Sequence, residues 1–118
     1  MNRKTFGTDG EYDAGDYLKG QGYEVLAMNY RRPTGEVDLI ARQRRTVVFV
    51  EVKRRTTRRY GAPAEAVTPA KRAHIVRTAA LYLQENRLDD VPVRFDILEI
   101  TPGAFRHIEA AFDATGIL

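Results

Sequence analysis

The sequence predicts an α/β domain with an antiparallel hairpin at the centre of a sheet and a helix on each side. Residues 36–41 and 47–53 both alternate with a period of two and are rich in β-branched side chains, which is typical of strands. Only the short polar segment 43–46 separates them, so they should form a hairpin. Signals for a helix start precede the hairpin at Thr8 and follow it at Thr68.

The first helix is expected to begin at a capping box formed by Thr8 and Glu11 and to end at Gly20-Gln21-Gly22. Glu11 lies at the edge of the apolar stripe of this helix, so two roles are open: the cap itself, or a third acidic group directed toward the hairpin. The elements that follow are expected to be a strand over 23–30, a basic loop over 29–34, the hairpin, a basic loop after residue 55, a helix over 69–86, and strands over 93–100 and 106–113. His74 and His107 are expected to face water.

The composition is that of a soluble globular protein, with 43% hydrophobic and 30% charged residues. No apolar run is long enough to span a membrane, and the N-terminus lacks the apolar core of a signal peptide. The absence of cysteine is typical of a cytoplasmic protein, which is the location we expect. The length predicts a single domain over residues 1–118, with residues 1–7 as a flexible tail.

Basic residues are clustered around the hairpin rather than spread evenly. Such a basic zone favours a polyanionic substrate, although a solvated arginine-rich surface explains the same clusters. The candidate nucleic-acid-binding residues are Arg31, Arg32, Arg54, Arg55, Arg58, Arg59 and Lys71.

The pairing register of the hairpin brings two carboxylates together. If the turn is centred on the Arg-Arg pair at 44–45, Asp38 faces Glu51 and Glu36 faces Lys53, whereas a bulge would shift the pairing by one residue. Directly opposed residues have Cβ atoms about 4.5–5.5 Å apart, where like charges repel. A cation must therefore offset the repulsion, either Lys53 alone or a metal ion with Lys53 beside it.

Asp38, Glu51 and Lys53 on one strand face outline a hydrolytic phosphodiesterase site. Carboxylate oxygens suit Mg²⁺ or Mn²⁺, which keep several waters and share their coordination with substrate phosphates. Lys53 could orient the attacking water or stabilise charge on the phosphorus oxygens. The sequence contains no serine and no Gly-rich phosphate-binding loop, which excludes a Ser-His-Asp triad and argues against a P-loop hydrolase.

The motif Asp38…Glu51-Val52-Lys53 resembles the PD-(D/E)xK signature of the restriction-endonuclease-like nucleases, with Val37 in place of the proline. More narrowly, the chain resembles the bacterial YraN family (UPF0102), small proteins related to archaeal Holliday-junction resolvases. The matching segments, between Gly10 and about Ile100, are Gly-Glu-Val-Asp-Leu-Ile (35–40), Val-Phe-Val-Glu-Val-Lys-Arg-Arg (48–55), Tyr-Gly-Ala-Pro (60–63), Lys71 and Arg-Phe-Asp (94–96).

The resemblance implies an αβββαβ core with a mixed sheet and an active site at Asp38, Glu51 and Lys53, the two carboxylates binding Mg²⁺ or Mn²⁺. In resolvase relatives an acidic residue on the first helix joins the site, and Glu11 matches that position. The implied function is a metal-dependent endonuclease acting on DNA, including branched or damaged structures, and a homodimer is expected because resolvase relatives act as dimers. Two alternatives stay open: a non-catalytic nucleic-acid-binding protein that keeps this fold, and a protein-interaction module in which Glu36 and Lys53 form only a surface ion pair.

Overall fold

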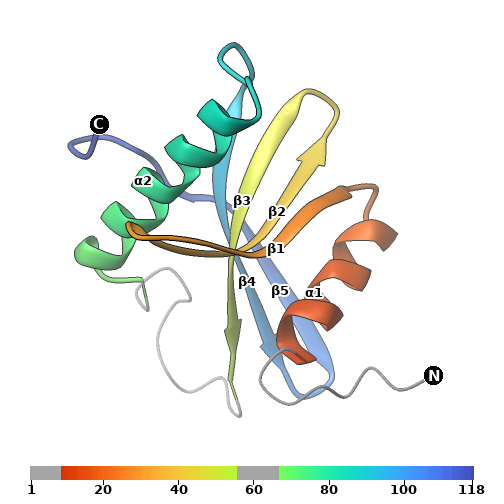
Figure 1. Cartoon of the computed structure of the whole chain (residues 1–118). Coiled ribbons are helices and arrows are strands. Elements are labelled where there is room, and N and C mark those ends of the chain that lie inside the picture. The colour runs from red at the N-terminus through yellow and green to blue at the C-terminus, as the bar shows by residue number, and fades with distance from the viewer. Residues whose placement is uncertain (1–8, 56–66) are drawn as a thin grey trace.

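The computed structural model describes residues 9–55 and 67–118, with side chains from residue 13 on, and shows a five-stranded sheet with a helix on each face (Figure 1). The elements are α1 (Asp9–Gly20), β1 (Glu24–Arg32), β2 (Gly35–Gln43), β3 (Thr46–Arg54), α2 (Pro69–Glu85), β4 (Val93–Thr101) and β5 (Ala104–Phe112). The strands lie in sequence order, with β3 parallel to β4 and the other neighbours antiparallel. The predicted αβββαβ core with a mixed sheet is confirmed, whereas the expected tail and Thr8 lie outside the described residues.

Both helices end or begin where the sequence signals them. Helix α1 ends in a Schellman motif, in which the N–H of Tyr23 donates to the carbonyl of Leu18 at 2.9 Å and Gly22 has a φ of 92°. Helix α2 begins at the N-cap Thr68, whose hydroxyl accepts the N–H of Lys71 at 3.2 Å. In the ranges that the structure describes, no helix combines the length and apolarity that a membrane crossing needs.

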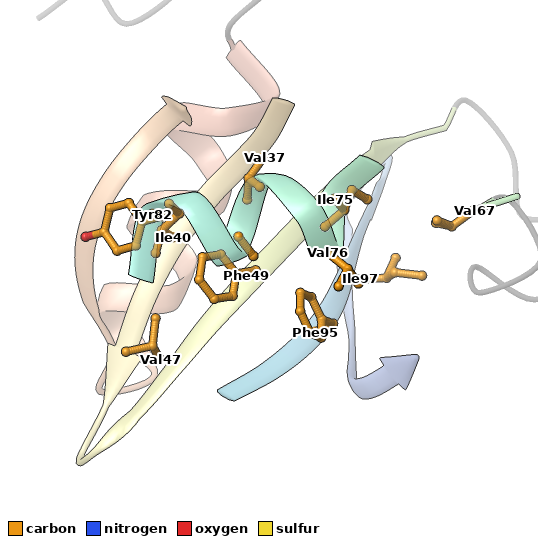
Figure 2. Packing of buried hydrophobic residues seen from close by; sticks show 11 residues of the cluster. Val37, Ile40, Val47, Phe49, Val67, Ile75, Val76, Tyr82, Phe95 and Ile97 are labelled. Carbon is orange, nitrogen blue, oxygen red and sulfur yellow. The ribbon is translucent and has the colours of Figure 1, made fainter. Parts of the chain in front are cut away.

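Two hydrophobic clusters lie on opposite faces of the sheet. The α2-side cluster contains Phe49, whose ring lies 5.6 Å from that of Phe95 and 6.0 Å from that of Tyr82 (Figure 2). The α1-side cluster is formed around Leu18 of α1 and the strand residues Leu39, Ala41, Val48, Val50, Leu98 and Ile100. Strand β3 therefore sends alternate side chains into two separate cores, which explains its nearly continuous apolar sequence.

About halfway along strands β1 and β2, the side chains of a given parity change from one face of the sheet to the other. Met28 packs in the α1-side cluster, but Tyr30, two residues along, packs in the α2-side cluster, and Leu39 and Val37 repeat this change on β2. Residues two apart on a regular strand share a face, so the strand pair is rotated between these positions. Asn29, at the point of rotation, has a φ of 53°, a left-handed conformation that asparagine tolerates better than most residues.

The rotation lays the tip of the β1–β2 hairpin across α2. The hydroxyls of Thr34 and Thr78 lie 2.7 Å apart, and Arg32 forms an ion pair with Glu85 at 2.8 Å. Because the tip is held on α2, β1 continues through Arg32 and pairs it with Gly35. The expected basic loop over 29–34 is therefore wrong, and residues 33–34 alone form the turn.

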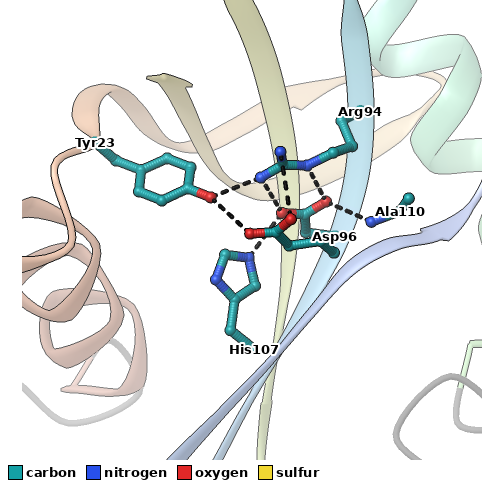
Figure 3. Close-up of polar contacts among 6 residues, drawn as sticks. Tyr23, Arg94, Asp96, His107 and Ala110 are labelled. Carbon is teal, nitrogen blue, oxygen red and sulfur yellow. Dashed lines mark hydrogen bonds and ion pairs between the residues drawn. The ribbon is translucent and has the colours of Figure 1, made fainter. Parts of the chain in front are cut away.

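A buried carboxylate, Asp96, connects β4 to β5 (Figure 3). The Arg94 guanidinium donates to both of its oxygens at 2.9 Å, His107 Nε2 lies 2.7 Å from Oδ2, and the N–H of Ala110 donates to Oδ1 at 2.9 Å. Arg94 also donates to the Tyr23 hydroxyl at 2.6 Å, which connects the start of β1 to this cluster. We call these five residues the Asp96 cluster.

The Asp96 cluster corrects the expectation that His107 faces water, since its side chain is only 11% exposed. His107 lies opposite Leu98 on the α1 face of the sheet, and the Tyr23 ring covers it at a centroid distance of 5.7 Å. Strand β5 is thus covered on both faces at this point. The β4–β5 register shifts at Asp96, whose carboxylate accepts the N–H of Ala110 in place of a strand carbonyl.

Asp96→Ala should lower the free energy of unfolding by about 3–5 kcal/mol, because it leaves the Arg94 charge and the other donors buried without their acceptor. Urea denaturation at neutral pH measures this. Asp113→Ala is the control, because exposed Asp113 accepts the N–H of Thr115 at 2.9 Å, and it should cost only about 0.5 kcal/mol. Equal losses in the two variants would contradict the role given to Asp96.

The difference in the free energy of unfolding between the unaltered protein and Asp96→Ala should depend on pH. Burial by itself would raise the pKa of Asp96, but the hydrogen bonds from His107, Arg94 and Ala110 together hold that pKa below its ordinary value. The stabilisation is therefore complete above the unfolded-state pKa and is lost as the pH falls toward the lower folded-state pKa. The stability difference between the unaltered protein and Asp96→Ala should be constant down to about pH 5 and shrink below about pH 4.

Candidate functional site

The β2–β3 hairpin has the predicted register, with Arg44 in a left-handed conformation at the turn (φ 56°). In the described residues the paired positions of the two strands end at Leu39 opposite Val50. Beyond that pair, the Asp38 carboxylate accepts the N–H of Val52 at 2.8 Å. A side chain thus takes the place of the next strand carbonyl, and the two strands separate where the carboxylates were predicted to meet.

Glu51 is the buried centre of the site. Its side chain is 4% exposed, and its Oε2 atom contacts two ammonium groups, Lys71 Nζ at 2.6 Å and Lys53 Nζ at 3.4 Å. Lys53 therefore lies beside Glu51 as predicted, whereas Lys71 reaches the same oxygen from the first turn of α2. A buried carboxylate requires such compensation, because its desolvation is otherwise unfavourable.

A cavity of about 380 Å³ lies between the separated strands and the N-terminal half of α2. Asp38 and Glu51 line it together with Glu36, Lys71 and His74. The structure thus brings the two predicted metal ligands to one cavity. His74 is exposed, as expected.

Glu36 does not follow the predicted pairing. It was expected opposite Lys53, but it forms an ion pair with Arg31 of β1 at 3.3 Å, because the β2–β3 ladder ends before Glu36 is reached. Among the side chains that the structure describes, no group of three or more His, Cys, Asp or Glu residues is arranged to hold a metal ion. The side chain of Glu11, the predicted third acidic group, lies outside the described residues.

The pKa values of the two lysines are shifted in opposite directions. Burial lowers the pKa of Lys53, and the adjacent Lys71 charge adds to this against the opposing attraction of Glu51. Burial also acts on Lys71, but the hydrogen bond and charge of Glu51 together outweigh it and raise the Lys71 pKa. Lys53 is therefore the easier of the two to deprotonate.

The predicted nucleic-acid-binding residues that the structure describes all form ion pairs within the chain. These pairs are Arg31–Glu36 (3.3 Å), Arg32–Glu85 (2.8 Å), Arg54–Asp13 (3.0 Å), Arg55–Glu99 (3.1 Å) and Lys71–Glu51 (2.6 Å). Exposed ion pairs are weak, so Arg31 (72% exposed) and Arg54 (52% exposed) remain accessible to phosphate. Arg55, 18% exposed beside buried Glu99, is held inside the fold, while Arg58 and Arg59 lie outside the described residues.

Sequence reasoning placed Lys71 on the basic surface and missed its contact with Glu51. The signal for this contact was the mixed sheet. A parallel β3–β4 pair requires a crossover, so the helix between these strands runs back over the sheet from the C-terminal end of β3. That geometry places the first turn of α2, and with it Lys71, near Glu51.

The model of the uncharacterised protein family UPF0102 matches residues 10–100. A UPF0102 protein from Lachnoclostridium phytofermentans is 46% identical over 117 residues, covering 98% of this chain and 99% of that protein. Another, from Symbiobacterium thermophilum, is 47% identical over 103 residues, covering 87% of this chain and 86% of that protein.

Among solved structures, the fold is similar to that of Hjc, a Holliday junction resolvase from Archaeoglobus fulgidus. The TM-score is 0.53 at 16% sequence identity, with 90% of this chain and 78% of that chain covered. At this identity the likeness establishes a shared fold.

Asp38→Asn should leave the free energy of unfolding within about 0.5 kcal/mol of the unaltered protein, because an amide oxygen can still accept the Val52 N–H and the repulsion with Glu51 is removed. Asp38→Ala should lower it by about 1–3 kcal/mol, because the partly buried Val52 N–H loses this acceptor. Urea denaturation of the two variants in EDTA makes the comparison. If both are equally stable, the Asp38 carboxylate does not replace a strand partner.

Proposed function

The chain belongs to the UPF0102 family, and we propose that it is a divalent-metal-dependent endonuclease that hydrolyses phosphodiester bonds in DNA. The observation that supports this most directly is the cavity shared by Asp38 and Glu51, with Lys53 in contact with Glu51. The similarity to the fold of a Holliday junction resolvase makes branched DNA the first substrate to test. Because a fold hosts many functions, the proposal depends on these three side chains rather than on the fold.

Asp38 and Glu51 are suited to hold Mg²⁺ or Mn²⁺. Both offer hard oxygen donors to one cavity, and two protein carboxylates are enough for an ion that keeps several waters and shares substrate phosphates. The two ammonium groups on Glu51 indicate that this position already attracts cations. When bound, the ion would polarise a phosphate oxygen and lower the pKa of a coordinated water.

The role proposed for Lys53 is to act on the reacting phosphate. Its ammonium lies 3.4 Å from Glu51 Oε2, which holds it near the metal-binding carboxylate. A compact positive charge there would stabilise negative charge developing on the phosphorus oxygens or orient the attacking water. Arg31, exposed and paired with the cavity residue Glu36, is placed to contact a neighbouring phosphate.

A non-catalytic nucleic-acid-binding protein is the second candidate. The observation that favours it is the ionic balance of the site, since Glu51 already has two ammonium partners and is neutralised without a metal. In that case the basic surface alone would bind nucleic acid.

Excess Mn²⁺ should raise the Tm of the unaltered protein relative to EDTA, because a ligand that binds only the folded state adds about 2.7 kcal/mol at one hundred times its Kd. Asp38→Asn should lose this response, because it removes one charged ligand. Asp113→Asn, a change at an exposed carboxylate outside the cavity, should keep it. The measurement is the Tm of each protein in Mn²⁺ and in EDTA. If Mn²⁺ still raises the Tm of Asp38→Asn, the ion binds elsewhere.

Lys53→Ala should reduce cleavage at least about a hundredfold while changing DNA affinity only a few-fold, because one lysine contributes little to docking and much to the transition state. The measurement uses single-stranded, duplex and four-way-junction DNA with Mn²⁺ or Mg²⁺. Lys19→Ala, which removes an exposed lysine from the last turn of α1, should behave like the unaltered protein. Parallel loss of binding and cleavage in Lys53→Ala would count against a catalytic role, and an unaltered protein that binds every DNA but cleaves none would favour the second candidate.

A further inference from the structure

The Oε2 atom of Glu51 contacts a cation from helix α2 as well as Lys53 of its own strand. Lys71 Nζ lies 2.6 Å from Glu51 Oε2, closer than Lys53 Nζ at 3.4 Å. A carboxylate that is 4% exposed cannot rely on water for compensation, so in the metal-free protein the nearest ammonium is its main counter-ion. Lys71 therefore occupies the surroundings of Glu51 that a metal ion would need.

A divalent cation and this ammonium would compete for Glu51. Mg²⁺ binds carboxylate oxygens at about 2.0–2.1 Å, which would bring it next to the Lys71 ammonium. Like charges at such a distance repel strongly away from bulk water. Metal binding and the Lys71–Glu51 contact are therefore opposed.

Of the two lysines, Lys71 is the one whose ammonium can more easily move away from Glu51. Its side chain is 45% exposed, against 22% for Lys53, and its ammonium ends a flexible four-carbon chain. Its backbone is fixed by the N-cap, because its N–H donates to Thr68 Oγ1 at 3.2 Å. The ammonium can thus move away from Glu51 while helix α2 stays in place.

We propose that Lys71 is an exchangeable counter-ion, which neutralises Glu51 in the metal-free protein and is displaced when a divalent cation binds, leaving its ammonium free to contact a substrate phosphate. This inference rests on the metal site proposed above. It gives Lys71 a positioning role through Glu51, and it reconciles the ion-paired state of the cavity with a metal-dependent activity. Lys71 lines the cavity with Asp38 and Glu51, so a phosphate that enters this cavity would be near its ammonium.

The test is the affinity for Mn²⁺ in the absence of DNA, measured by isothermal titration calorimetry. Lys71→Gln should bind Mn²⁺ at least about fivefold more tightly than the unaltered protein, on the usual scale of coupling between two linked equilibria. Lys71→Arg should bind it no more tightly than the unaltered protein, because a guanidinium pairs with a carboxylate at least as firmly as an ammonium does. Arg77→Gln, which removes an exposed cation of α2 outside this cavity, should leave the affinity unchanged.

Two results separate failure of this inference from failure of the proposed function. If the unaltered protein binds Mn²⁺ and Lys71→Gln binds it equally or more weakly, Lys71 is not a competing cation, and the metal site stands without it. If neither protein binds Mn²⁺, both the metal site and the exchange are wrong. If Lys71→Gln fails to fold, the Mn²⁺ affinity of Lys71→Arg is the test. Tighter Mn²⁺ binding by Lys71→Arg than by the unaltered protein would also overturn the proposal.

Discussion

The site depends on one constraint: β3 must be antiparallel to β2 on one side and parallel to β4 on the other. Its pairing with β4 continues as far as Arg54, whereas its paired positions with β2 end at Leu39 opposite Val50. Asp38 takes the place of the missing partner through the N–H of Val52. The strands separate because one partner leaves while the other stays, and the opening that results is lined by carboxylates and covered by α2.

Much of this arrangement could be predicted from the sequence, because it depends on local patterns. The alternation of the two strands and the symmetry of a short turn fixed the register as far as Leu39 opposite Val50, and with it the strand ends from which Asp38 and Glu51 line one cavity. The helix boundaries followed from a glycine at position 22 and a threonine–proline pair at 68–69. The alternation of apolar residues does not show where β2 and β3 separate. The partner of Glu36 was therefore predicted on the wrong strand.

The remaining differences concern contacts between elements far apart in the chain. His107 occupies a polar position of an edge strand, and nothing in its local pattern shows that Tyr23 covers it. Lys71 lies on a helix face that looks solvated until the helix is placed over Glu51. In both cases a charged or polar side chain contacts a partner that only the tertiary fold supplies. The roles of Glu11, Arg58 and Arg59 stay predictions, because their side chains lie outside the described residues.

The two polar centres also differ in how much chain each must close, and this sets an order of assembly. The contact between Asp38 and Val52 spans 14 residues, whereas the contact between Tyr23 and Arg94 spans 71. Since closing a longer loop costs more entropy, and pairing of distant segments is the slow part of folding, the hairpin should form first and Tyr23 should join the Asp96 cluster last. A nascent chain would then carry Asp38 and Glu51 on one formed hairpin before Tyr23 contacts Arg94, so that assembly proceeds outward from the carboxylates.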